Sequence, residues 1–156
     1  MLIEVKIGAL IMDPNSNTPI VVLKGVETER ILPIWVGAFE ANAIALEIEK
    51  VVPQRPMTHD LLRNFIIELG FEVSKIVITD LKENTFYAQI ELLKDGEITF
   101  FDSRPSDAIA LALRSDCPIY VKEEVFDLSG EASEPEIEPE ITEEESPAED
   151  WPELLD

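Results

Sequence analysis

The sequence contains a single cysteine, Cys117, so no disulfide bond can form within the chain. Disulfides are common in secreted proteins and rare in the reducing cytosol, so the lone thiol predicts a cytoplasmic protein. Cys117 precedes Pro118 and has no histidine near it in the sequence, which favours a small buried residue over a nucleophile. Histidine is equally scarce: His59 is the only one, which excludes a zinc site built from several Cys and His side chains.

Long hydrophobic runs are also absent. No apolar stretch reaches the roughly 18 residues that a membrane-spanning helix needs, so the sequence predicts no membrane segment. After Met1 the residues alternate as in a strand, a pattern that does not predict a secretory leader. Hydrophobic residues nevertheless make up 46% of the 156 positions, which is enough for the core of one domain.

Basic residues are missing from the end of the chain. Residues 1–130 carry 21 acidic and 12 basic side chains (net −9), whereas residues 131–156 carry 12 acidic side chains and no basic one (net −12). A segment rich in Glu and Pro cannot bury enough apolar surface to offset the entropy of ordering it. We therefore expect a folded domain at 1–128 and a disordered acidic tail at 129–156. The tail ends in a small apolar group that could dock a partner: Trp151, Leu154 and Leu155.

The densest group of polar residues next to a predicted core lies in residues 98–114, ITFFDSRPSDAIALALR. An apolar strand leads to Pro105, which the first turn of a helix tolerates because its missing N–H would have no partner there. Ser103 is the predicted N-cap. The helix that follows is apolar on all sides, so it should be buried. Polar side chains therefore gather where a buried helix begins: Asp102, Arg104, Ser106 and Asp107.

The same pattern occurs twice in the chain. Residues 41–46 (ANAIAL) resemble residues 106–111 (SDAIAL), 65 positions later, and an apolar strand precedes both copies. We infer an internal duplication in which each half consists of strands followed by a buried helix. The start of the helix differs between the copies, GAFE at 37–40 against DSRP at 102–105. This difference makes the second start a candidate for an acquired function.

Hydrophobic periodicity predicts further strands and helices. Asp95-Gly96 is a strong hairpin signal, and Pro33 predicts an edge strand or a bulge. Residues 57–69 predict an amphipathic helix with Ile67 off its apolar stripe, at a candidate subunit contact. Because hairpins dominate, the predicted fold class is α+β: internally duplicated strands-then-helix units that form a mostly antiparallel sheet with packed helices. The stripe of the amphipathic helix consists of Leu61, Leu62, Phe65, Ile66 and Leu69.

Three separated blocks of sequence resemble the bifunctional nuclease domain family: LPIWVGAFEANAIALEIE (32–49), RPMTHDLL (55–62) and FDSRPSDAIALALR (101–114). The blocks stand in the family's order, and the resemblance covers about residues 1–126. It implies an α+β domain, nuclease activity on both DNA and RNA, and a homotrimeric assembly. The resemblance implies an activity but no settled catalytic mechanism, so the candidate catalytic residues are inferred from the sequence itself.

Asp102 and Asp107 are candidate metal ligands. Cleavage of phosphodiester bonds commonly uses a divalent metal, Mg²⁺ or Mn²⁺, held by carboxylates, and Arg104 could bind a phosphate through two parallel hydrogen bonds. The alternative is structural: Ser103 caps the helix, and Arg104 pairs with Asp107 at i,i+3. The sequence leaves both interpretations open.

His59 and Asp60 are the second candidate catalytic pair. A histidine can take up or release a proton near neutral pH, so it can activate water or a ribose 2′-OH as a general base. Alternatively, Thr58 caps the helix and the pair merely fills its first turn, where the helix dipole favours Asp. A solvated face explains the acidic residues of the first buried helix better than a metal site does: Glu40, Glu47 and Glu49.

The net charge opposes binding of nucleic acid, which normally requires a basic surface. The best candidates for a local basic cluster are Arg55, Arg63 and Arg104. The sequence also contains no glycine-rich phosphate loop and no nuclease motif with a carboxylate pair and a catalytic lysine. We therefore expect at most weak, metal-assisted cleavage of DNA and RNA with little sequence preference. A second class stays open: a non-enzymatic oligomeric regulator or scaffold whose acidic tail docks partners.

Overall fold

The computed structural model describes residues 1–130, and its helices and strands follow the predicted order. Each predicted strand and helix is present, with ends that differ by a few residues. The strands are β1 (Leu2–Asp13), β2 (Thr18–Gly25), β3 (Ile31–Trp35), β4 (Glu72–Lys82), β5 (Thr85–Lys94), β6 (Glu97–Ser103) and β7 (Ile119–Lys122). The helices are α1 (Ala38–Ile48), α2 (Thr58–Glu68), α3 (Pro105–Ser115) and α4 (Glu123–Gly130).

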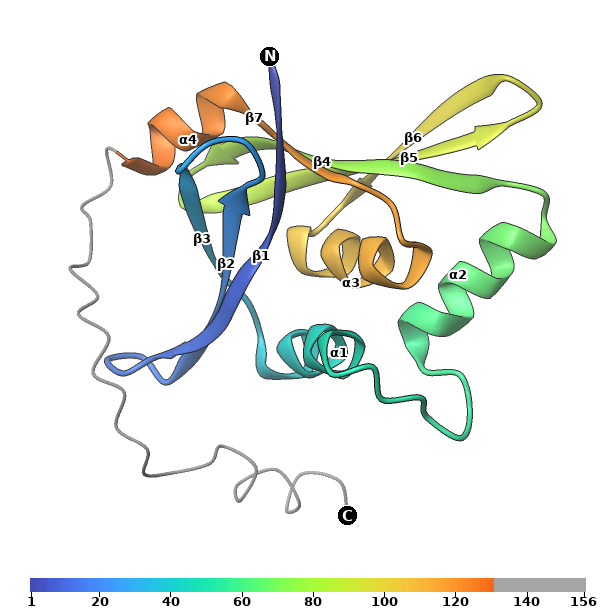
Figure 1. Ribbon diagram of the computed structural model, residues 1–156, viewed down its shortest axis with the longest axis horizontal. Coiled ribbons are helices and arrows are strands. Elements are labelled where there is room, and N and C mark those ends of the chain that lie inside the picture. The colour runs from blue at the N-terminus through green and yellow to red at the C-terminus, as the bar shows by residue number, and fades with distance from the viewer. Residues whose placement is uncertain (131–156) are drawn as a thin grey trace.

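The sheet confirms the internal duplication. Its seven strands run in the order β3-β2-β1-β7-β4-β5-β6, so each half is an antiparallel meander of three strands followed by a helix, α1 or α3 (Figure 1). The short strand β7 joins the halves because it pairs antiparallel with β1 and parallel with β4. The mixed, mostly antiparallel sheet with packed helices is the α+β fold that the sequence predicts.

The helices pack on the sheet and on one another. Helix α1 contacts β2, α3 contacts β4 and β5, and α3 also contacts α1 and α2 (Figure 1). Residues Ala108–Ala112 of α3 are buried, as their all-round apolar character predicts. The largest fully buried side chains come from both halves of the duplication: Leu23, Leu32, Ile34, Ile44, Ile76, Ile78, Ile109 and Leu111.

Two turn-related predictions are confirmed at the sheet. Asp95 and Gly96 connect β5 to β6 and both have positive φ, 49° and 79°, as a tight hairpin turn requires. Pro33 lies in β3, which is an edge strand, where the missing N–H of a proline costs no ladder hydrogen bond.

Two capping predictions are wrong. Arg104, and not Ser103, is the N-cap of α3, because Ser103 is the last residue of β6 and its hydroxyl donates to the Arg104 carbonyl at 2.8 Å. Met57, and not Thr58, is the N-cap of α2. The apolar stripe of α2 is not a core face: Ile66 is its one buried member, while the other four are 40–61% exposed.

The predicted acidic tail lies outside the described residues, as do Trp151, Leu154 and Leu155. Helix α4 ends at Gly130, the last described residue. None of the helices within residues 1–130 is both long and apolar enough to cross a membrane.

Candidate functional site

Helices α1 and α3 lie side by side and point in the same direction. Glu40 in the first turn of α1 contacts Arg104 at the start of α3, and Glu47 near the end of α1 contacts Arg114 near the end of α3. The start of α2 also reaches this place, because its His59 contacts Asp107 in the first turn of α3. Side chains from the beginnings of α1, α2 and α3 therefore meet at one point.

Four side chains form a continuous polar group at this point, which we call the Asp107 cluster: Glu40, His59, Arg104 and Asp107. Arg104 donates from Nε to Asp107 Oδ2 at 2.9 Å and from Nη2 to Asp107 Oδ1 at 3.1 Å. Its Nη1 donates to Glu40 Oε1 at 3.0 Å. His59 Nε2 lies 2.9 Å from Asp107 Oδ1. Asp107 is thus the centre of the cluster, bound by an arginine fork and a histidine.

The environment of Asp107 keeps it ionised. Burial alone would raise the pKa of this carboxyl, but hydrogen bonds from Arg104 and His59 outweigh it and the pKa is lowered. The hydrogen bonds to Asp107 and Glu40 raise the pKa of Arg104. The pair is therefore charged on both sides at neutral pH.

The charge of Asp107 fixes the chemistry of His59. An ionised carboxylate only accepts hydrogen bonds, so Nε2 of His59 carries the hydrogen and donates it to Asp107. In the neutral imidazole, Nδ1 then holds the free electron pair. The side chain of His59 is 13% exposed, so the ring is largely held by protein. An Asp–His pair of this kind orients one ring nitrogen as a proton acceptor.

Arg104 has N–H groups without a protein partner that can bind a ligand from solvent. Its guanidinium has five N–H groups, of which three donate to Asp107 and Glu40, leaving one each on Nη1 and Nη2. The side chain is 63% exposed. An exposed guanidinium with N–H groups to spare can bind a phosphate or a carboxylate from solvent.

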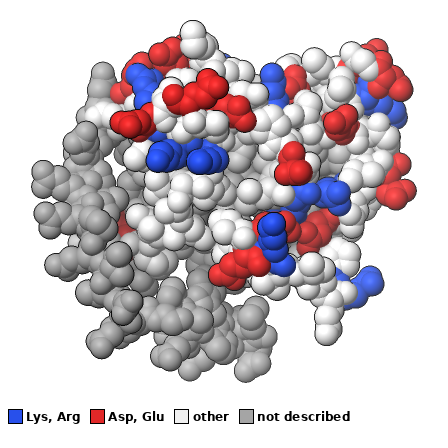
Figure 2. Space-filling model, in the orientation of Figure 1, with Lys and Arg blue, Asp and Glu red and all other residues white. Residues whose placement is uncertain are grey.

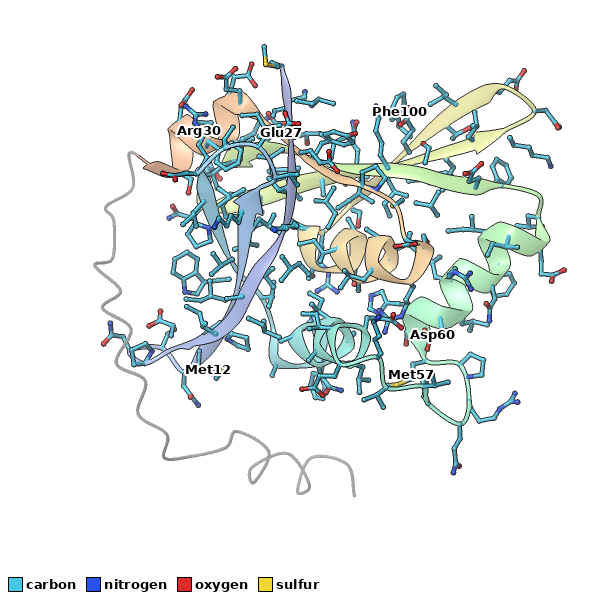
Figure 3. The ribbon with its side chains drawn as sticks, in the orientation of Figure 1. Met12, Glu27, Arg30, Met57, Asp60 and Phe100 are labelled. Carbon is cyan, nitrogen blue, oxygen red and sulfur yellow. The ribbon has the colours of Figure 1, made fainter. Side chains whose placement is uncertain are left out.

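Asp60 belongs to a different group of contacts. Its Oδ1 accepts from Arg114 Nε at 2.8 Å, and its Oδ2 accepts from the Met57 backbone N–H at 3.0 Å (Figure 3). Arg114 is only 4% exposed and also donates to the carbonyls of Ala110 and Ala43. Burial alone would raise the pKa of Asp60, but the hydrogen bonds from Met57 and Arg114 lower it. Arg114 therefore ties α1, α2 and α3 together, and its partner Asp60 lies outside the Asp107 cluster.

The structure does not bring Asp102 to Asp107. Asp102 is exposed on β6, opposite Gln89 of β5, while both oxygens of Asp107 are bound by Arg104 and His59. Residues 1–130 contain no group of three or more His, Cys, Asp or Glu side chains that could hold a metal ion. The donor set of the described residues thus does not match a carboxylate-rich metal centre, and the metal-binding role of the two aspartates stays a prediction.

Sequence reasoning linked Arg104 to Asp107 correctly but missed partners from the other half of the chain. Glu40 was expected on a solvated face, yet it is bound to Arg104, and Glu47 lies 3.7 Å from Arg114. The internal duplication indicates these contacts between α1 and α3, because two matching buried helices that pack side by side bring equivalent turns together. Arg114 at the end of an otherwise buried helix also required an acidic partner, since buried charges are paired.

The helix N-termini supply positive potential that the composition lacks. Acidic and basic side chains alternate over the face in Figure 2, with no broad basic area. Each helix N-terminus, however, carries a partial positive charge from unpaired backbone N–H groups, and the cluster includes first-turn side chains of α1, α2 and α3. Acidic first-turn residues (Glu40, Asp60 and Asp107) compensate part of that potential.

The fold and this cluster define an α+β domain with a histidine–aspartate pair beside an exposed arginine. The chain belongs to the bifunctional nuclease domain family, whose model matches residues 21–134. It is 44% identical over 127 residues to an uncharacterized protein of Mycobacterium tuberculosis, covering 81% of this chain and 76% of that protein.

Two plant relatives carry the family's activity in their names. The chain is 33% identical over 107 residues to bifunctional nuclease 1 of Arabidopsis thaliana, covering 66% of this chain and 33% of that protein. It is also 33% identical over 111 residues to bifunctional nuclease 2 of Oryza sativa subsp. japonica, covering 69% and 34%. The chain thus spans about a third of the length of these plant proteins.

Proposed function

We propose that this protein is a nuclease that hydrolyses phosphodiester bonds of DNA and RNA with little sequence preference, and that the Asp107 cluster is its active site. The observation that carries the proposal is the Asp–His pair beside an exposed arginine, within a family of bifunctional nucleases. The cluster joins a proton acceptor and a phosphate-binding group, the two functions that hydrolysis of a phosphodiester requires.

Each residue of the cluster has a distinct role in this proposal. The remaining N–H groups of Arg104 bind phosphate oxygens, and Nδ1 of His59 takes the proton of an attacking water, or of a 2′-OH when the substrate is RNA. As the new P–O bond forms, the P–O bond to the leaving oxygen breaks, and that oxygen takes a proton from solvent. Asp107 keeps His59 in the required tautomer and stabilises the imidazolium that forms. Glu40 positions Arg104 through Nη1. Asp60 acts on this site only indirectly, by fixing the start of α2.

The charge of the cluster sets the expected affinity. With neutral His59, two carboxylates and one guanidinium leave a formal charge of −1 before any phosphate arrives. Binding of nucleic acid should therefore be weak. Added salt should weaken it much further, since phosphate contacts release counterions. A contribution of Mg²⁺ or Mn²⁺ stays a prediction, and the experiment below includes it as a separate arm.

The test is cleavage of labelled single-stranded DNA and RNA with Mg²⁺, Mn²⁺ or EDTA. Wild type is purified side by side with His59→Asn, Asp107→Asn and Asp102→Asn. We expect loss of activity by about a hundredfold or more in the first two variants, the usual effect of removing a general base. Asp102→Asn removes the same charge as Asp107→Asn from an exposed position, so it should stay active.

Two results would reject parts of this proposal. Equal cleavage by wild type, His59→Asn and Asp107→Asn would mean a contaminating nuclease or another site. Loss of metal-dependent activity in Asp102→Asn and Asp107→Asn alike, with His59→Asn active, would replace the Asp–His pair by the aspartate metal site.

We also propose that the protein is a homo-oligomer, with a trimer as the expected state. Large apolar side chains are exposed along α2 and on the edge strand β6, where Phe100 is 58% exposed (Figure 3). Continuous exposed apolar surface is typical of protein interfaces. Light scattering coupled to size exclusion gives the mass directly, and a monomer at all concentrations would reject the proposal. The side chains concerned are Leu61, Leu62, Phe65, Ile67, Leu69, Ile98, Phe100 and Phe101.

A further inference from the structure

Gly37 is the N-cap of α1, and its backbone conformation does not require a glycine. Its φ of −71° and ψ of 161° are extended values that any residue adopts. Serine, threonine, aspartate and asparagine are the usual residues at this position, because their side chains accept a hydrogen bond from the first turn. Glycine forgoes that contact, so the reason for a glycine here lies in the space around it.

The space next to the Gly37 Cα is occupied by the carboxylate of Glu40. A Cβ atom added to Gly37 would overlap Oε2 of Glu40 and lie only 3.0 Å from its Cδ. Glu40 in the first turn of α1 therefore folds back over the start of its own helix, where the helix dipole favours a negative charge. The overlap involves the end of a flexible side chain and no backbone atom, so a Cβ at residue 37 would displace the carboxylate and leave the fold intact.

The same carboxylate holds Arg104. Oε1 of Glu40 accepts from Nη1 of Arg104 at 3.0 Å, while Asp107 binds Nε and Nη2 of the same guanidinium. Contacts on both sides fix the direction of a side chain that is 63% exposed. A long side chain that is already held in place loses less conformational entropy when it binds a ligand. Displacement of the Glu40 carboxylate would leave Arg104 attached to Asp107 alone.

The second copy of the duplicated unit lacks both parts of this arrangement. At the offset of 65 positions, Asp102 stands in the place of Gly37 and Pro105 in the place of Glu40. The glycine and the glutamate thus differ together between the two copies. This joint difference is expected if the glycine serves the glutamate.

We propose that Gly37 is a positioning residue of the Asp107 cluster: because it has no Cβ, it gives the Glu40 carboxylate the place from which that group orients Arg104 towards a phosphate. The inference rests on the proposed nuclease function for its effect on cleavage. The position of the carboxylate, however, is tested on Arg104 itself. Failure of the nuclease proposal and failure of this one are therefore distinguishable.

The experiment compares the Arg104 Nε–H signal in ¹H–¹⁵N correlation spectra of the full chain and its variants. Glu40→Ala gives the signal of an Arg104 that has lost this contact. Gly37→Ala and Gly37→Ser should both shift the signal towards that of Glu40→Ala, although serine is a favoured N-cap. The matched control is Gly130→Ala, which adds the same methyl group where no atom lies within 4 Å, so its Arg104 signal should equal that of wild type.

A double variant tests whether Gly37 acts through Glu40. Once Glu40→Ala has removed the carboxylate, Gly37→Ala has nothing to displace and should add no further shift of the Arg104 signal. A wild-type signal in Gly37→Ser would overturn the proposal, because the effect of Gly37→Ala would then be one of helix capping. An undiminished shift by Gly37→Ala in the Glu40→Ala background would overturn it as well.

Kinetics on labelled single-stranded DNA test the effect on the reaction. Gly37→Ala should raise KM about three- to tenfold, the scale of coupling within one hydrogen-bond network. Its kcat should be nearly unchanged, since His59 and Asp107 keep their contact and only binding of phosphate is weakened. A shifted Arg104 signal with an unchanged KM would overturn the role in phosphate binding. Absence of cleavage by wild type would reject the nuclease proposal, while the spectra would still decide whether Gly37 positions Glu40.

Discussion

Replacement of Asp60 by alanine should destabilise the fold strongly, because Asp60 is the main partner of a buried cation. The side chain of Arg114 is 4% exposed, and its Nε donates to Asp60 at 2.8 Å. Removal of one member of a buried ion pair costs about 3–5 kcal/mol, since the remaining charge stays buried without compensation. Glu47 remains 3.7 Å from the same nitrogen, so we expect about 3 kcal/mol, the lower end of that range.

The backbone contact of Asp60 adds to this cost. Its carboxylate accepts the Met57 N–H at 3.0 Å, and loss of such a capping contact costs about 1 kcal/mol. The total of about 4 kcal/mol corresponds to a fall in Tm of roughly 8–16 °C for a chain of this size. Thermal and urea unfolding, followed by circular dichroism, measure it beside Asp102→Ala, in which the lost carboxylate is exposed. A fall in Tm of less than about 3 °C would refute the structural role of Asp60.

Three further predictions concern catalysis, acid stability and the thiol. Arg104→Lys keeps the charge but loses the planar fork, so kcat/KM for single-stranded DNA should fall at least roughly tenfold, mainly through KM; an unchanged KM would place phosphate binding elsewhere. The pKa values of Asp60 and Asp107 are lowered in the folded protein from the ordinary 3.8, so the unfolded chain binds more protons there. Stability should therefore be retained above that pH and decrease as the pH falls through and below it, with a flatter profile for Asp60→Asn in urea titrations at successive pH values. Burial raises the pKa of Cys117 to about 11, so iodoacetamide should label the folded protein at pH 8 far more slowly than the urea-unfolded chain, as followed by mass spectrometry.

The sequence was sufficient for most of the fold because its local signals and its global pattern agree. The apolar helix after Pro105 could only be buried, and its repeat at residues 41–46 predicted a second helix in the same role. The Asp95-Gly96 turn set the β5–β6 hairpin. These signals are either local in the chain or repeated within it, which is why periodicity and turn chemistry detect them.

Predictions failed where the outcome depends on packing between distant segments. The α2 stripe has the spacing of a core face, but α2 lies at the margin of the domain and only Ile66 reaches the core. Ser103 is a good capping residue, yet β6 continues through it and moves the cap to Arg104. Propensity describes which local structures a residue favours, and tertiary contacts determine which of them it adopts in the fold.

The candidate site also combines contacts that are local in the sequence with contacts between distant segments. Arg104 and Asp107 are three residues apart, so their pairing follows from helical spacing alone. The contact between His59 and Asp107 spans 48 positions and depends on where α2 crosses α3, which no sequence spacing reveals. Asp60, next to His59 in the chain, points to a different partner because consecutive residues in a helix face different directions.

The position of the Asp107 cluster follows from the duplication itself. Two equivalent units that pack about the central strand β7 bring α1 and α3 side by side with their N-termini together. One unit supplies Glu40, the other supplies Arg104 and Asp107, and the helix that connects the units supplies His59. Neither unit could build the cluster alone, so a change at the start of α3 could acquire chemistry while α1 kept the structural role. The GAFE and DSRP segments therefore differ at the place where one copy supplies Glu40 and the other supplies Arg104 and Asp107.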